Sequence, residues 1–325
     1  QLRQREQARR HRRLMVITAT SVAASVVLMG LTLFALIARR EAEVQRSIAE
    51  QRSLTAERTT AFLKSIFEVS DPSEARGNSI TAREVLDRGA RQIDEGLKRE
   101  PSVRAALTTT LGTVYASLGL YRQADEILAK ASRLAGVEPA VAAKTAIALG
   151  ELRTLQGAYP EANQQFGKAD EAMSTLDSAV DIDRARGLIA WGESLATTDQ
   201  FAAAREKIAA GIDAARRSRP PDAALIARGL EALGLTALLS GDLPAAEASY
   251  REALTMRIAE SGQIHPKVSE TLNSLGSIEY LRGNRIQAAE YFQRALGIDR
   301  RVLGPTHPDL ASTLNNLARV YLEQR

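Results

Sequence analysis

The feature that most constrains this chain is an internal repeat. A large apolar residue followed by a small one recurs six times, with the small residues 38, 42, 42, 42 and 42 positions apart. The first five small residues are Gly112, Gly150, Gly192, Gly234 and Gly276, and the sixth is Ala318. Twelve positions after the glycines stand Ala124, Ala162, Ala204, Ala246 and Ala288. This periodicity predicts a stack of similar units in which each unit contacts mainly its neighbours.

The spacing of small and large residues predicts what each unit is. Four residues after each alanine comes a large apolar side chain, and three further on the residue is small again. In a pair of packed helices, a glycine lets the two axes approach closely, and a large side chain from the second helix fills the space beside it. We therefore predict an all-α solenoid of helix pairs in which the glycines and alanines are packing residues.

Composition and motifs exclude several classes of function. The 325 residues contain no cysteine and three histidines, which leaves no thiolate metal site and no disulfide framework. No phosphate-binding loop, nucleophile elbow or zinc-protease motif is present. His265 and His307 each precede a proline and recur in phase with the repeat, so we predict turn residues there. We expect no catalytic residue, no metal and no cofactor in this chain.

The positive charge is concentrated at the start of the chain. Residues 1–13 hold six arginines and one glutamate, a net charge of +5, whereas the whole chain carries +4. The remaining residues therefore sum to −1, and the basic isoelectric point is no argument for a nucleic-acid-binding domain. We expect no nucleic-acid partner.

Residues 14–38 form an uncharged run that predicts a transmembrane helix. Twenty-five residues at about 1.5 Å each exceed the roughly 30 Å hydrocarbon core of a bilayer. Six arginines precede the run and four follow it up to Arg52, which favours a cytoplasmic N-terminus and repeats outside the cytoplasm, at the bacterial inner membrane. The small residues Ala19 and Ala23 would let two spans pack as a homodimer, although such residues are common in spans without that role.

The sequence divides into four parts on this basis. Residues 1–13 form a basic juxtamembrane segment, 14–38 the transmembrane helix, 39–100 a juxtamembrane helix and helical lead-in, and 101–325 the repeats. Within the lead-in, Thr81 and Glu84 have the spacing of a capping box and predict a helix from there to about Lys98.

The repeats resemble a known family. Leu111-Gly112 with Tyr115, followed by Ala124 and Leu128, is similar to the tetratricopeptide repeat, a helix–turn–helix unit. The 42-residue period and the in-phase His-Pro pairs resemble the kinesin-light-chain type of that repeat. The resemblance covers residues 101–325, as five repeats and a half-repeat. Because a half-repeat leaves an apolar face uncovered, and because the chain begins at Gln1, we expect a longer protein.

A second resemblance concerns the context of the repeats. Residues 62–90, with Phe67, Asp71-Pro72 and Gly77, resemble the segment after the span in bacterial serine/threonine kinases with C-terminal tetratricopeptide repeats. No kinase motif is present, so the resemblance implies only a non-catalytic, membrane-anchored sensor or scaffold region that binds a protein or peptide. Two alternatives stay open, a structural scaffold for a membrane complex and the sensor region of a membrane-bound transcriptional regulator.

Helical spacing also predicts a binding face. Residues three before and one or four after each glycine share a face of the first helix. In the last copies these are Asn273, Ser277, Tyr280, Asn315, Arg319 and Leu322. The kinesin-light-chain type is similar in placing asparagines at the matching position, where an amide can donate to and accept from a peptide backbone. The resemblance implies ligand contacts there, and the alternative is a solvated polar face.

Overall fold

The computed structural model describes residues 39–40, 81–176, 181–303 and 307–323, and within these ranges the repeat region is built from helices alone. They are α2 (Ala82–Gly96), α3 (Pro101–Ser117), α4 (Tyr121–Ser132), α5 (Pro139–Leu155), α6 (Tyr159–Ser174), α7 (Asp181–Ala196), α8 (Phe201–Arg217), α9 (Ala223–Leu239), α10 (Leu243–Ser261), α11 (Pro266–Leu281), α12 (Arg285–Val302) and α13 (Pro308–Leu322). The all-α prediction is confirmed.

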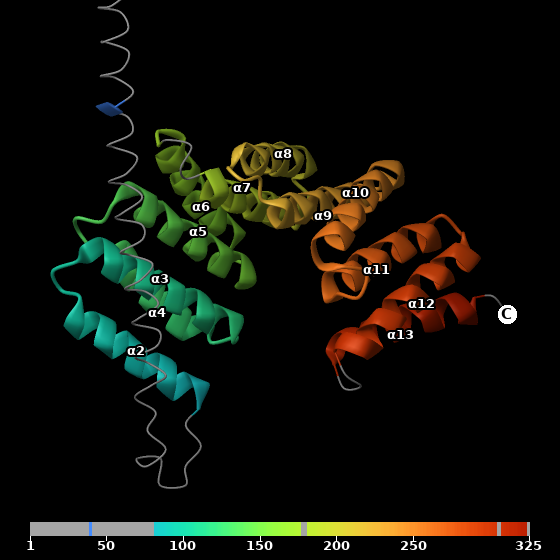
Figure 1. Cartoon of the computed structure of the whole chain (residues 1–325), viewed down its shortest axis with the longest axis horizontal. Helices are drawn as coiled ribbons and strands as arrows, with labels where there is room; N and C mark the ends of the chain where they lie inside the picture. The colour runs from blue at the N-terminus through green and yellow to red at the C-terminus, as the bar shows by residue number, and fades with distance from the viewer. Residues whose placement is uncertain (1–38, 41–80, 177–180, 304–306, 324–325) are drawn as a thin grey trace, which may run out of the picture. The chain divides into compact units, whose positions relative to one another are not determined.

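The helices pack as consecutive pairs, with one helix before the pairs and one after them (Figure 1). The pairs are α3 with α4, α5 with α6, α7 with α8, α9 with α10, and α11 with α12. We call α3, α5, α7, α9, α11 and α13 the first helices and their partners the second helices. Each second helix also packs on the next first helix, so the pairs form a continuous solenoid from α2 to α13.

Local sequence explains where the helices begin. Thr81 and Glu84 form the predicted capping box, in which the Thr81 N–H donates to Glu84 Oε2 at 2.8 Å. Pro101, Pro139 and Pro266 occupy first turns, where a missing N–H is not needed. The His265 Nδ1 accepts a hydrogen bond from the Lys267 N–H and caps α11, as expected for a turn residue.

The turn inside each pair requires a left-handed residue. Gly119, Gly157, Gly241 and Gly283 have φ between 74° and 87° and follow first helices. In the third repeat the same place is taken by Asp199, with φ of 58°. Aspartate tolerates this region better than most side chains do, so the turn survives the loss of glycine.

Close contact within each pair depends on the repeat glycines. A Cβ atom added to any of the five would lie 2.3–2.8 Å from a large side chain of the second helix. The pairs are Gly112 with Leu128, Gly150 with Phe166, Gly192 with Ile208, Gly234 with Tyr250, and Gly276 with Phe292. The five repeat alanines, Ala124, Ala162, Ala204, Ala246 and Ala288, are fully buried. Both sets lie where the two axes come together.

A second recurring contact joins neighbouring first helices, and we call it the repeat seam. The residue three positions before one repeat glycine contacts the residue five positions before the next. The polar pairs are Thr109 with Thr145 at 2.8 Å, Glu231 with Thr271 at 2.9 Å, and Asn273 with Thr313 at 2.8 Å. The apolar pairs are Ile147 with Gly187 and Ile189 with Gly229, where an added Cβ would lie 2.7 and 3.2 Å from the isoleucine.

The membrane prediction concerns a different part of the chain. The predicted span at 14–38, the basic segment 1–13 and residues 41–80 all lie outside the described residues. Within the ranges that are described, none of the helices has the length and apolar character needed to cross a bilayer. The span, the homodimer through it and the contact with lipid therefore stay predictions from sequence.

The packing at the glycines can be tested by substitution. Gly234→Leu would place side-chain atoms inside the ring of Tyr250, whose Cδ2 lies 2.8 Å from the Cβ position. We expect a loss of about 1–3 kcal/mol or more in the free energy of unfolding, measured by urea denaturation. The matched control is Gly297→Leu in α12, where a Cβ meets nothing within 4 Å. Since leucine favours helix over glycine, the control should gain up to about 1 kcal/mol. Equal curves for both variants would contradict the close packing.

Candidate functional site

The candidate site is a groove along the first helices of the early repeats. Two cavities, of about 310 Å³ and 270 Å³, open on α3, α5 and α7 and share Thr113, Ala148 and Glu151. We call the continuous space the first-helix groove. A concave site that combines apolar walls with few polar groups is the usual form of a binding site.

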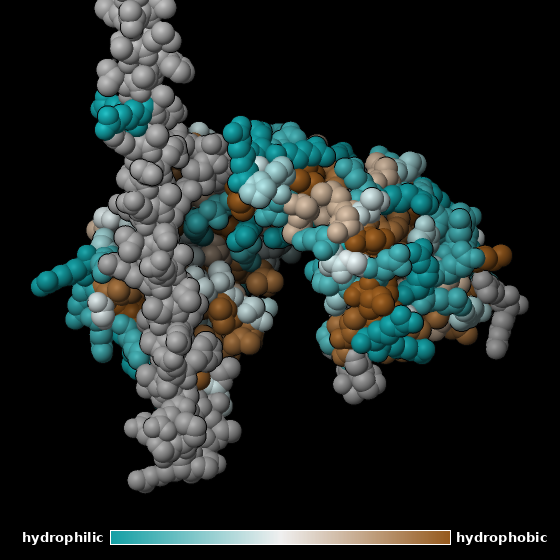
Figure 2. Space-filling model, in the orientation of Figure 1, coloured by the Kyte–Doolittle hydropathy of each residue, from teal (hydrophilic) through white to brown (hydrophobic). Residues whose placement is uncertain are grey.

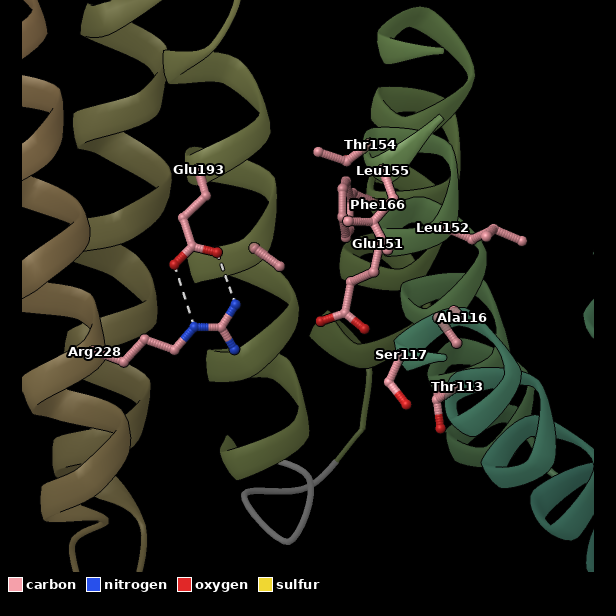
Figure 3. Close-up of a pocket in the computed structure, with 12 residues that line it drawn as sticks. Thr113, Ala116, Ser117, Glu151, Leu152, Thr154, Leu155, Phe166, Glu193 and Arg228 are labelled. Atoms are coloured by element: carbon pink, nitrogen blue, oxygen red, sulfur yellow. Dashed lines mark hydrogen bonds and ion pairs between the residues drawn. The ribbon is translucent and has the colours of Figure 1, made fainter. Parts of the chain in front are cut away.

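The walls of the larger cavity are mostly apolar. Leu152 and Phe166 are almost fully buried at its base, and Leu155 stands at its edge with 56% of its surface exposed. The hydroxyl-bearing Thr113 and Ser117 come from α3 and are exposed (Figure 3). The groove therefore offers apolar contact with a few hydrogen-bonding groups beside it.

An ion pair crosses from α7 to α9 at one side of the larger cavity. The Arg228 guanidinium donates to both carboxylate oxygens of Glu193, from Nε at 3.2 Å and from Nη2 at 2.7 Å (Figure 3). Burial lowers the pKa of Arg228, but the hydrogen bonds to Glu193 and its charge outweigh that effect and raise the pKa overall. This two-point geometry holds both side chains in place.

Glu151 occupies the centre of the groove without such a partner. Its carboxylate points from α5 into the open space facing the Glu193–Arg228 pair (Figure 3). No described side chain or backbone N–H donates to it. Burial raises the pKa of Glu151 and the Glu193 charge raises it further, whereas Arg228 and Arg186 act in the opposite direction without cancelling the rise.

The smaller cavity carries charges of both signs. Lys144 Nζ on α5 lies 2.7 Å from Asp183 Oδ2 on α7, so these two charges are paired. Arg186 is exposed and forms no ion pair with a described residue. Glu151 and Arg186 are therefore the two groove charges that are left for a ligand.

The residues predicted as ligand contacts lie on the matching face of the last repeats. Asn273 is partly buried, and its Nδ2 donates to Thr313 Oγ1 across the repeat seam. Its Oδ1 is buried without a partner among the described residues. The Ser277 hydroxyl donates to the Asn273 backbone carbonyl at 3.0 Å. These side chains thus already stabilise the stack, and ligand binding by them stays a prediction.

Tyr280 lies in a charged cluster. The guanidinium groups of Arg285 and Arg319 lie 4.3 and 4.7 Å from its ring centroid, and its hydroxyl donates to Glu323. The ring is therefore already occupied by two cations. Asn315 and Leu322 are exposed, with no hydrogen bond from the Asn315 amide to a described residue. Hydrophobic side chains also surface in several separate patches over the repeats (Figure 2).

The helical spacing rule also selects the residues that line the groove when it is applied to the early repeats, whereas the predicted ligand contacts lie in the late ones. In the first three copies, the positions one and four after the glycine give Thr113, Ala116, Glu151, Thr154, Glu193 and Ala196, and all of these but Ala196 line the larger cavity. The prediction of ligand contacts followed the asparagines of the late copies, so it did not include Glu151. The sequence does contain a signal for Glu151. This glutamate lies one position after a repeat glycine, on the predicted binding face, and its neighbours along the helix are apolar.

The described residues offer no metal centre, because no group of three or more histidine or acidic side chains comes together among them. The residues that line the groove offer hydrogen-bonding groups, charges and apolar surface. None of its described side chains forms a nucleophile with an adjacent base.

Comparison with known proteins identifies the repeats. Residues 227–267 and residues 267–325 each match a tetratricopeptide repeat family model. Residues 227–325 thus carry tetratricopeptide repeats, as the spacing predicted for 101–325, and such repeats form interaction scaffolds for proteins. No curated protein matches the sequence significantly.

Solved structures share the fold. BtubC (BKLC) from P. vanneervenii is 20% identical with a TM-score of 0.59, over 70% of this chain and 95% of that one. The nearly identical repeats of a putative kinesin light chain from P. anserina are 16% identical with a TM-score of 0.51, over 62% and 98%. A Rap protein complexed with competence and sporulation factor is 13% identical with a TM-score of 0.55, over 73% and 69%.

The partly buried carboxylate of Glu151 gives the groove a pH-dependent effect on stability. Because burial raises the pKa of Glu151 above the value of 4.5 in the unfolded chain, the folded state holds this proton more tightly. Its ionisation therefore costs stability as the pH rises. We expect Glu151→Gln to melt higher than the wild type at pH 7 and to match it below pH 4.5, where both side chains are neutral. A lower melting temperature at pH 7 would show that the charge is stabilised by its surroundings.

Proposed function

We propose that the repeat region binds an extended segment of a partner protein in the first-helix groove. The observation that carries the proposal is the groove itself, which joins apolar walls on three first helices to unpaired charged groups at Glu151 and Arg186. Extended peptides suit such a site because their side chains alternate between apolar wall and polar rim. A Rap protein, whose fold is similar, has been seen complexed with competence and sporulation factor.

We further propose that this binding region is the sensor of a membrane-anchored bacterial signalling protein. The uncharged run at 14–38 and its basic flanks support the anchor, and residues 62–90 support the context of a serine/threonine kinase whose catalytic domain precedes Gln1. On this proposal, the N-terminus faces the cytoplasm and the groove samples the other side of the membrane.

Site-specific photocrosslinking in living cells tests the groove. A photoreactive phenylalanine analogue would replace Thr113 in the groove, Asn315 on the same face of α13, or Glu171 on the exposed side of α6. We expect partner adducts from position 113 and none from position 171, since the groove holds the ligand. Adducts from position 315 would extend the site to the late repeats. Adducts from position 171 alone would place binding outside the first-helix groove.

The membrane arrangement has its own test. The full chain should stay in the pellet when membranes are washed with alkaline carbonate, because the run at 14–38 is long and apolar enough to span. Alkaline phosphatase fused after residue 100 should be active, since this enzyme works only outside the cytoplasm. Release of the chain into the wash would contradict the anchor. An inactive fusion in washed membranes would reverse the orientation.

A further inference from the structure

We propose that Glu151 is the anchoring point for a cationic side chain, arginine or lysine, of the segment that binds in the first-helix groove. The inference rests on the proposed function and adds the chemical class of the ligand to it. It selects a partner segment in which a basic residue stands next to an aliphatic one.

The carboxylates of the groove differ in whether they are satisfied. Glu193 accepts two hydrogen bonds from Arg228, at 3.2 and 2.7 Å. Asp183 lies 2.7 Å from the ammonium group of Lys144. Glu151 accepts no hydrogen bond from a described residue. Of the three acids, Glu151 is therefore the one that has neither a hydrogen bond nor an ion pair with a described residue, and its full acceptor capacity remains for a ligand.

The position of Glu151 makes it accessible to a ligand in either half of the groove. It is one of the residues that line both cavities, and its carboxylate faces the open space between α5 and α7 (Figure 3). The surrounding wall is apolar, with Ala148, Leu152 and Leu155 on the same helix. In such surroundings a carboxylate is poorly solvated. A cation that hydrogen-bonds to it replaces much of the stabilisation that the charge loses when water is excluded.

Charge complementarity favours a cation over an anion. The charged side chains that line the larger cavity are Glu151, Glu193 and Arg228, which sum to −1, whereas those of the smaller cavity, Lys144, Glu151, Asp183 and Arg186, sum to zero, so the argument applies to the larger cavity. The guanidinium of Arg228 already pairs with Glu193 through Nε and Nη2, so an anionic group in the larger cavity would meet two carboxylates and one cation that is already neutralised. An incoming arginine or lysine would bring the lining to neutrality and pair with the free acid.

The exposed side chain of Leu155 is the reason why we expect an aliphatic residue next to the basic residue of the ligand. More than half of its surface is open at the edge of the larger cavity, four positions along α5 from Glu151 and therefore on the same side of the helix. A segment whose basic side chain reaches Glu151 lays its next side chains along this edge. An aliphatic residue there covers apolar surface that the free protein leaves in water.

The test uses the full chain in detergent micelles and three pools of short fluorescein-labelled peptides. Each pool has a fixed leucine beside a variable centre, which is arginine, its neutral isostere citrulline, or glutamate, within a randomised small-residue background. Fluorescence anisotropy gives the affinity for the wild type, for Glu151→Gln and for the control Glu171→Gln, whose side chain is exposed on α6 outside the groove. Thermal denaturation verifies that each variant is folded.

We expect the wild type to bind the arginine pool roughly 10- to 100-fold more tightly than the citrulline pool, the range for a hydrogen bond to a charged group. The preference should vanish in Glu151→Gln and persist in Glu171→Gln. Equal binding of both pools, or an arginine preference that survives in Glu151→Gln, would overturn the cationic anchor and leave groove binding intact. Tightest binding of the glutamate pool would assign recognition to Arg186 instead. Binding of no pool would reject peptide recognition itself, and with it the proposed function.

Discussion

The contact between a glycine on one helix and a large side chain on the next is the constraint on which the rest of the molecule depends. At Gly112, Gly192 and Gly276 alike, a single added carbon would lie closer to the facing side chain than van der Waals contact allows. The two helices of each pair therefore lie at a fixed separation. Because each second helix packs on the next first helix, this separation also determines where the next pair lies. The groove follows from this regularity, because it is the line along which successive first helices present the same face.

Most of the architecture was predictable, and the reason is physical. Close helix packing requires small residues at fixed spacing, so the pattern of Gly150, Ala162 and Phe166 and its copies is visible in the order of the amino acids alone. The same holds for caps, since a capping box such as Thr81 with Glu84 depends on residues three apart. Contacts of this kind are local or periodic, and both leave a signature in one chain.

The site was less predictable because it depends on how charges pair across repeats. Glu151 and Glu193 occupy equivalent positions, yet Arg228 reaches from α9 to one of them and leaves the other free. The spacing of the repeat does not predict whether Arg228 pairs with Glu151 or with Glu193. The spacing likewise does not state that the amide of Asn273, a predicted ligand contact, donates to Thr313 of the next repeat. Side-chain partners from other repeats decide both outcomes.

The repeat seam makes the order of the units matter. An isoleucine at one seam meets a glycine, and at another seam a glutamate accepts a hydrogen bond from the hydroxyl of a threonine. If two repeats were exchanged so that Ile147 faced Thr271, the threonine would be too bulky for the space that Gly187 leaves, and its hydroxyl would lose the contact with Glu231. The two residues at each seam are thus complementary in size and polarity, so a repeat packs well only on its own neighbour. The repeats share one period, but the seam residues determine the order in which they can stack.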